Sequence, residues 1–223
     1  INRGSPEAVD LAVGGVIGSN IANVMLVLAI AMLIGAASQP DKDLKQDALM
    51  LLAATTFVVL SVVMGEFPVW LGVLSISSMG GYYAYIFRTR GGDDSDEEDS
   101  WIPRGYAYAL VAFLFGLIMV KFGSDLLIEG GVGLAISIGV SEAVIGLTLV
   151  AFGTSLPELA VTITASIRGV QGVAIGNILG SNVANVMAVL GIGAIVAQGL
   201  SVSGSFLTLD IWVLLVSSGI IGV

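Results

Sequence analysis

Seven apolar segments limit what this chain can fold into, because each is long enough to cross a hydrocarbon layer of about 30 Å. They cover approximately residues 11–36, 47–64, 68–87, 105–138, 142–167, 172–197 and 206–223. The residues AVILMFWYC make up 56% of the sequence and charged residues 11%, whereas soluble domains carry roughly 25% charge. We therefore predict an all-α polytopic membrane protein whose surroundings are the lipid bilayer.

The composition also excludes several classes of function. Much of the formal net charge of −9 comes from the acidic run between Asp93 and Asp99, so this charge says little about partners. The absence of Cys and His from the sequence excludes disulfides, imidazole catalysis and the usual zinc or haem sites. A basic patch of the kind that binds nucleic acid is also absent. We expect no cofactor and no nucleic-acid partner, and the oligomeric state stays open.

One long polar connector divides the chain into two halves. We assign residues 1–90 to a first half with three spans, 91–103 to an acidic linker, and 104–223 to a second half with four spans. Basic residues gather on the linker side of the predicted spans, while Arg3 stands on the other side. They are Lys42, Lys45, Arg88, Arg90, Arg104 and Arg168. This bias predicts a multi-pass protein of the cell (plasma or inner) membrane with a cytoplasmic linker. The linker lacks the Gly and ligand spacing of a calcium loop, which favours a plain solvated segment.

An internal repeat relates the two halves. AVGGVIGSNIANVMLVLAI at 12–30 aligns without gaps to AIGNILGSNVANVMAVLGI at 174–192, with twelve of 19 positions identical. An odd number of predicted spans brings the chain from one copy to the other, so the copies should cross the membrane in opposite directions. Inverted repeats are typical of secondary transporters, which bind ions near the midplane where the halves meet. We predict an inverted-repeat secondary transporter fold.

A carboxylate lies in the middle of the span that precedes the second copy. Glu158 is costly in lipid, which makes it a candidate functional residue. Pro157 removes a backbone donor, so we expect the helix to break over 153–157 and to expose carbonyl groups near Ala151. Carbonyl, hydroxyl and carboxylate oxygens are the ligands that Na⁺ and Ca²⁺ prefer, and Thr154, Ser155 and Glu158 supply two of these kinds.

Each copy of the repeat carries a Ser and an Asn four positions apart, which places both side chains on one helical face. These pairs are Ser19 with Asn23 and Ser181 with Asn185. Such a pair, taken alone, also suits an interhelical hydrogen bond, but its recurrence beside Glu158 favours a cation site. Asn20 and Asn182 lie one position off that face, and we expect them to lock neighbouring helices together. Glycines four positions apart in each copy allow close helix approach.

The motifs closely resemble those of the calcium/cation antiporters, and most of all the prokaryotic Na⁺/Ca²⁺ exchangers. GTSLPEL at 153–159 and GNILGSNVANV at 176–186 resemble the second alpha repeat of that family, and GGVIGSNIANV at 14–24 resembles the downstream part of the first. The resemblance covers essentially the whole chain. It implies a bundle of ten spans, of which this chain holds the third to the ninth.

The resemblance also implies roles for individual residues. Glu158 is expected to be a central ligand shared by Ca²⁺ and Na⁺. The other ligands implied in this way are Thr154, Ser155, Ala151 (through its carbonyl), Ser181, Asn185, Ser19 and Asn23. Two departures from the family pattern stand out. The GTSxPE motif of the first repeat, with its second Glu, is not in this sequence, and Gly15 stands where the second copy has Asn177.

These observations predict an antiporter that moves Ca²⁺ in exchange for Na⁺ by alternating access, with both ions as transported substrates. The alternatives are an H⁺/Ca²⁺ or other cation antiporter and a passive cation channel. An intramembrane enzyme would need a base to activate Ser155, and the sequence has no His and no suitably placed Lys. We therefore predict that the chain is not an enzyme.

Overall fold

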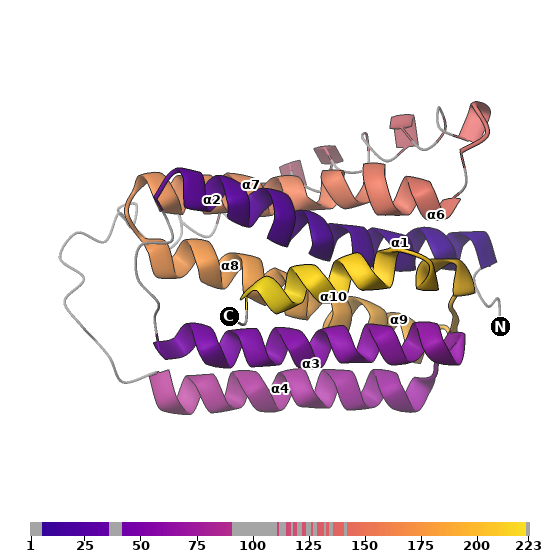
Figure 1. The fold of residues 1–223 in the computed structure, drawn as a ribbon, viewed down its shortest axis with the longest axis horizontal. Coiled ribbons are helices and arrows are strands. Elements are labelled where there is room, and N and C mark those ends of the chain that lie inside the picture. Colours follow the sequence, from indigo (N-terminus) through magenta and orange to yellow (C-terminus); the bar gives the residue numbers. More distant parts are fainter. Residues whose placement is uncertain are drawn as a thin grey trace.

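The computed structural model describes residues 6–35, 42–90, 136–140 and 142–221, with scattered positions between 111 and 133. The acidic linker predicted at 91–103 lies outside the described residues, as does most of the span predicted at 105–138. Nearly all of the described chain is helical, as the long apolar segments predict. Figure 1 shows these helices packed side by side as an elongated bundle.

The first half consists of three long helical rods. The first rod joins α1 (Pro6–Ala22), the π-helix η1 (Asn23–Leu28) and α2 (Ala29–Leu33) without a turn between them. The other two are α3 (Lys42–Met64) and α4 (Val69–Arg90). Gly65 ends α3 with a φ of 73°, a left-handed conformation that glycine adopts without steric cost.

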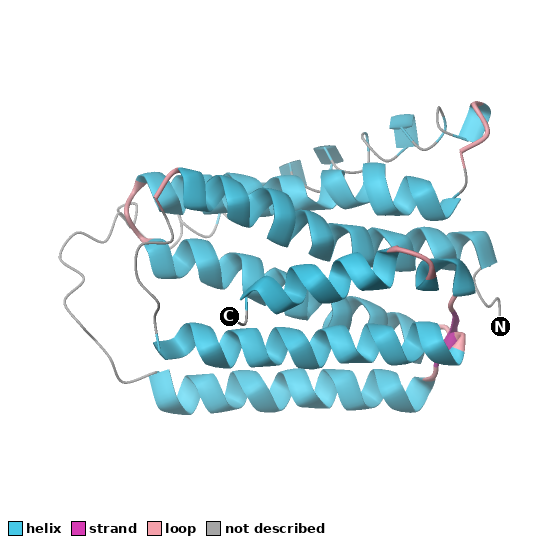
Figure 2. Cartoon of the chain, viewed as in Figure 1, coloured by secondary structure: helices cyan, strands magenta, loops and turns pink. Residues whose placement is uncertain are grey.

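The second half begins with a rod that joins α6 (Glu142–Ile145), the π-helix η2 (Gly146–Val150) and α7 (Ala151–Ile167). A second rod joins α8 (Gln171–Ala184), the π-helix η3 (Asn185–Leu190) and α9 (Gly191–Val196). The 3-10 helix η4 (Gly204–Leu207) then leads into α10 (Asp210–Ile221). Two short strands, β1 (Glu66–Phe67) and β2 (Leu200–Ser201), pair antiparallel and tie the two halves together at one end of the bundle (Figure 2).

The two copies of the repeat run in opposite directions. In Figure 1 the chain passes from right to left along α1 and α2, and from left to right along α8 and α9. A π-helix begins at the equivalent residue of each copy, Asn23 in the first and Asn185 in the second. The predicted inverted-repeat fold is therefore confirmed, and the two copies share even their local irregularity.

Four helical rods among the described residues are long and apolar enough to cross a membrane. They are Val9–Leu33, Lys45–Met64, Leu147–Ile167 and Gln171–Val196. The segment predicted at 68–87 also forms a helix, α4, with 22 residues, but its Ser and Tyr content makes it less apolar than these four. The segment predicted at 206–223 forms the shorter apolar helix α10.

The apolar core lies where the two halves meet. Val13 and Ile17 of the first copy and Leu179 and Val183 of the second pack in one buried cluster. Helix α3 packs against both α8 and α10, so the helices of the two halves interdigitate rather than forming separate units. This packing places the polar faces of the two repeat copies inside the bundle.

The predicted helix break at 153–157 is wrong, because α7 continues through Pro157 without interruption. A proline is tolerated inside a membrane-spanning helix when neighbouring helices, hydroxyl side chains or a local change of pitch compensate for the lost donor. Here the irregularity is η2, whose last residue, Val150, lies about two turns before Pro157. The Thr154 hydroxyl donates to the carbonyls of Val150 and Ala151, over 3.0 and 3.1 Å, at the junction between η2 and α7.

Candidate cation site

The Ser and Asn side chains of the two repeat copies form one hydrogen-bond network between the halves. Asn23 donates its Nδ2 to Asn182 Oδ1 at 2.8 Å and to Ser181 Oγ at 3.2 Å. Its counterpart Asn185 donates its Nδ2 to Asn20 Oδ1 at 3.1 Å and to Ser19 Oγ at 3.3 Å. The hydrogen bonds are therefore symmetric: in each copy the second Asn donates to the Ser and to the first Asn of the other copy.

Asn20 and Asn182 lie at the centre of this network. Asn20 Nδ2 donates to the backbone carbonyl of Asn182 at 3.1 Å, and Asn182 Nδ2 donates to the backbone carbonyl of Asn20 at 3.2 Å. Both side chains are buried. The prediction that these residues lock neighbouring helices is confirmed, since the two bonds join α1 to α8.

A third helix meets the network through Ser155 of α7. Its hydroxyl lies 3.1 Å from the Ser19 hydroxyl, and both side chains are buried. The approach of α7 is close because Gly18 leaves room for it. A Cβ added to Gly18 would lie 2.4 Å from the Leu147 carbonyl oxygen and 2.7 Å from the Ala151 Cβ. The glycine therefore sets the distance between α1 and the rod that carries Glu158.

Two buried oxygen atoms in this region accept no hydrogen bond from any described residue. One is Asn23 Oδ1 and the other is Glu158 Oε2. A buried acceptor that lacks a partner costs about 1–3 kcal/mol, and more when it is charged. An arrangement that leaves an amide oxygen and a carboxylate oxygen in this state is suited to a cation, which both groups can coordinate.

The backbone around Glu158 is held from α8 by a residue whose role the sequence did not indicate. Asn177 donates its Nδ2 to the Glu158 carbonyl and to the Thr162 hydroxyl, and each bond is 3.2 Å long. Thr162 is fully buried. From the sequence, Asn177 stood out as a difference from Gly15 in packing, and Thr162 gave no signal because a single Thr in an apolar helix is common.

The predicted site residues therefore fall into two groups. Five of them are joined in the network, namely Ser19, Asn23, Ser155, Ser181 and Asn185. Ala151 is buried beside Gly18, and Glu158 is half-buried one turn beyond Ser155. Thr154 is exposed, and its hydroxyl bonds to its own helix. The assignment of these eight residues as ion ligands stays a prediction.

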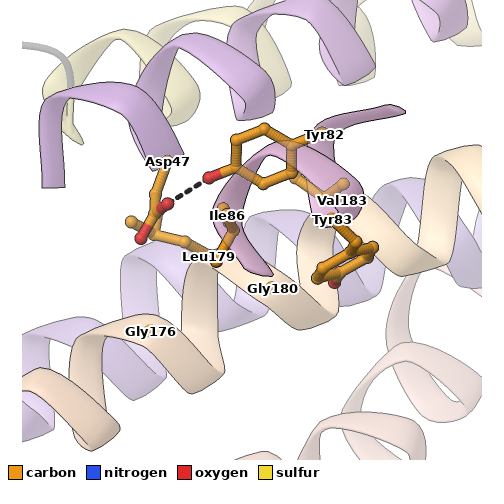
Figure 3. A pocket seen from close by; sticks show the side chains of 8 residues that line it. All are labelled: Asp47, Tyr82, Tyr83, Ile86, Gly176, Leu179, Gly180 and Val183. Carbon is orange, nitrogen blue, oxygen red and sulfur yellow. Dashed lines mark hydrogen bonds between the residues drawn. The ribbon is translucent and has the colours of Figure 1, made fainter. Parts of the chain in front are cut away.

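A cavity of about 210 Å³ lies away from this network, between α3, α4 and α8. It is lined by Asp47, Tyr82, Tyr83, Ile86, Gly176, Leu179, Gly180 and Val183, and Figure 3 shows the Tyr82 hydroxyl directed at Asp47, to which it donates a hydrogen bond. The Asp47 carboxylate and the Tyr82 hydroxyl are therefore already engaged with each other. Among the described residues, Asp and Glu nowhere form a group of three that would hold a resident metal ion.

The family model for "Sodium/calcium exchanger protein" matches residues 3–88 and 108–223 of this chain. The chain belongs to that family. Its relatives include proteins named as an antiporter and as exchangers, and the prediction that the chain is not an enzyme agrees with these names. Together with the apolar helical rods, this membership makes the chain part of a multi-pass membrane protein.

Individual proteins to which the chain is similar support the assignment. The chain is 50% identical over 84 residues to the sodium/calcium exchanger MaX1 of Methanosarcina acetivorans, which covers 38% of this chain and 24% of that protein. It is 30% identical over 202 residues to the inner membrane protein YrbG of Escherichia coli, which covers 86% of this chain and 62% of YrbG. The chain thus spans about 62% of the length of relatives that it matches broadly.

The fold is also that of a solved exchanger. The sodium-calcium exchanger NCX_Mj, soaked with 2.5 mM Na⁺ and 0.1 mM Ca²⁺, superimposes with a TM-score of 0.69 at 30% sequence identity. The match covers 96% of this chain and 68% of that chain. The predicted family and the helical exchanger fold are therefore both confirmed, and the count of ten spans stays a prediction.

Proposed function

We propose that the exchanger containing this chain moves Ca²⁺ across the membrane in exchange for Na⁺, and that both ions use the oxygens between α1, α7 and α8. The observation that carries this proposal is the pair of buried, unpartnered oxygens, Asn23 Oδ1 and Glu158 Oε2, beside the symmetric network. Both are hard oxygen ligands of the kind that Na⁺ and Ca²⁺ share. The names of the related exchangers support the choice of these two ions.

Each group has a defined part in the proposed mechanism. Glu158, in the middle of α7, supplies the negative charge that balances the charge of the bound cation. Asn23 and Asn185 supply neutral amide oxygens, and Ser155, Ser19 and Ser181 add hydroxyl oxygens around them. Ca²⁺ and Na⁺ compete for the same ligands, so one ion must leave before the other binds. This mutual exclusion couples the two fluxes without any contact between the ions.

Alternating access follows from the opposite directions of the two halves. Rocking one inverted repeat against the other opens an ion site to one side of the membrane and then to the other. The contact surface between the halves includes the network residues and the apolar cluster that contains Ile17 and Leu179. We propose that the acidic linker at 91–103 faces the cytoplasm of a cell whose plasma or inner membrane holds the exchanger, in line with the distribution of Lys and Arg.

Uptake of ⁴⁵Ca²⁺ into proteoliposomes that contain the complete exchanger tests this function. Vesicles loaded with Na⁺ and diluted into Na⁺-free buffer should accumulate Ca²⁺, whereas vesicles with equal Na⁺ on both sides should not. Uptake that is independent of the Na⁺ gradient would indicate a channel, and uptake driven by an H⁺ gradient would indicate an H⁺/Ca²⁺ antiporter. Either result would overturn the proposal, as would the absence of uptake.

A further inference from the structure

A backbone carbonyl determines the orientation of the Asn182 side chain. The Asn20 carbonyl can only accept a hydrogen bond, so Asn182 must direct its Nδ2 at it, as the 3.2 Å contact shows. The Asn182 Oδ1 therefore points away from that carbonyl and can only accept. It accepts from Asn23 Nδ2 at 2.8 Å. The Asn20 carbonyl thus determines, through Asn182, which side of the Asn23 amide faces Asn182.

A second contact fixes the same amide. The Ser181 hydroxyl donates to the Ile178 carbonyl at 3.1 Å, which leaves the Ser181 oxygen to accept from Asn23 Nδ2 at 3.2 Å. Both hydrogens of the Asn23 amide are then in use. The Asn23 Oδ1 is left on the opposite side, buried and without a hydrogen-bond donor among the described residues. A flipped Asn23 would place its oxygen against two acceptors and its NH₂ group where a cation would bind.

The other half repeats this logic. Asn20 Nδ2 is committed to the Asn182 carbonyl at 3.1 Å, so Asn20 Oδ1 accepts from Asn185 Nδ2 at 3.1 Å. The Ser19 oxygen accepts from the same Asn185 amide at 3.3 Å. Asn182 thereby orients the amide of Asn23, and Asn20 orients the amide of Asn185.

We propose that Asn20 and Asn182 are positioning residues for the cation site, which hold the amides of Asn185 and Asn23 so that oxygen rather than nitrogen faces the ion. This inference rests on the proposed function, because it assigns a role at the same site. Asn20 and Asn182 do not coordinate the ion themselves. Their effect on ion binding passes entirely through the amides that they orient.

A double-mutant cycle on the complete exchanger tests the inference, with the Ca²⁺ dissociation constant measured by calorimetry. Asn182→Leu, which keeps the volume but removes the acceptor, should weaken Ca²⁺ binding by about tenfold or more, as expected when a ligand amide is free to turn. In an Asn23→Ala background the same change should alter the dissociation constant by less than about twofold, since the amide that it orients is absent. If Asn182→Leu does not fold, Asn182→Ser, which is too short to reach Asn23, replaces it.

The buried pair Thr55 and Ser218 provides the matched control. Their hydroxyls lie 3.0 Å apart and join the two halves, and Thr55 donates to the Leu51 carbonyl, which is outside the network. Thr55→Val should leave Ca²⁺ affinity within about twofold of wild type while lowering the thermal midpoint. Equal weakening by Asn182→Leu with and without Asn23, or unchanged affinity in Asn182→Leu, would overturn the inference. Wild-type protein without Na⁺-driven Ca²⁺ uptake would instead overturn the proposed function, so the two failures are distinguishable.

Discussion

Asn20 and Asn182 lie 162 residues apart in sequence, and each donates its side-chain amide to the backbone carbonyl of the other, over 3.1 and 3.2 Å. An approximate local two-fold axis between the two inverted repeat copies accounts for this exchange. The same axis relates Asn23 to Asn185 and Ser19 to Ser181. A pair of polar residues on this axis therefore gives the two halves a fixed register where their ion ligands meet.

The first prediction concerns Glu158. Replacing it with Gln keeps the shape but removes the negative charge that a bound cation requires, so Glu158→Gln should abolish Na⁺-driven ⁴⁵Ca²⁺ uptake without preventing folding. Glu66→Gln is the control, because Glu66 is exposed in β1, just after the end of α3, and should tolerate the change. Near-normal exchange in Glu158→Gln would remove this residue from the site.

The second prediction concerns the hydroxyl pair at Thr55 and Ser218. Thr55 Oγ1 also donates to the Leu51 carbonyl at 3.0 Å, so Ser218 supplies the hydrogen between the two hydroxyls. Ser218→Ala should lower the free energy of unfolding by about 0.6–1.7 kcal/mol, the range for hydrogen bonds between membrane helices. Adding Thr55→Val should cost less than its effect alone, as a cycle of thermal midpoints in detergent would show. Full additivity would mean that the pair does not interact.

The third prediction concerns Gly18. An added methyl group would overlap the Leu147 carbonyl and the Ala151 side chain, so α1 and the α6–η2–α7 rod must separate. Gly18→Ala should cost about 1–3 kcal/mol of stability, as overpacking does, and should weaken Ca²⁺ binding because Ser19 moves away from Ser155. The control is Gly172→Ala near the start of α8, where a Cβ would meet no atom within 4 Å. If Gly18→Ala binds Ca²⁺ as wild type does, the spacing of these helices does not matter for the site.

The repeat made much of this architecture predictable. Identity between 12–30 and 174–192, combined with the number of spans, predicts two antiparallel copies, and the position of Asn20 beside the Ser–Asn face predicts its role as a lock. Both predictions rest on helical periodicity and on the cost of unpaired polar groups in lipid. These two effects can be recognised from short stretches of sequence. The sequence therefore indicated that Asn20 and Asn182 join helices, whereas the structure shows that each bonds to the backbone carbonyl of the other.

Other features depend on tertiary contacts that no local pattern carries. Pro157 predicts a break, but α7 continues through it, and the irregularity of this rod is the π-helical turn at 146–150 that packs against Gly18. The π-helices after Asn23 and Asn185 have ordinary helical sequences, so their wider turns follow from packing. Nothing in the sequence indicates the contact between Thr55 and Ser218, because each residue alone is a common substitute for Ala in an apolar helix.

The last prediction concerns Asn185, whose Nδ2 donates to Ser19 Oγ and Asn20 Oδ1. A carboxylate at this position has no hydrogen to donate, and Asn20 cannot turn its own amide to help, because its Nδ2 is committed to the Asn182 carbonyl. The introduced carboxyl keeps the network only when it is protonated. In Asn185→Asp, Na⁺-driven Ca²⁺ flux should therefore become pH-dependent and fall as the pH rises through roughly 5 to 8, the range expected for a carboxyl in a buried setting. Flux measured at matched ion gradients across this range checks it, with Gln198→Glu, which adds an acid in an exposed turn, as the control. A pH profile identical to that of wild type would place Asn185 away from the ion path, and a rise in flux with pH would contradict the orientation that Asn20 imposes.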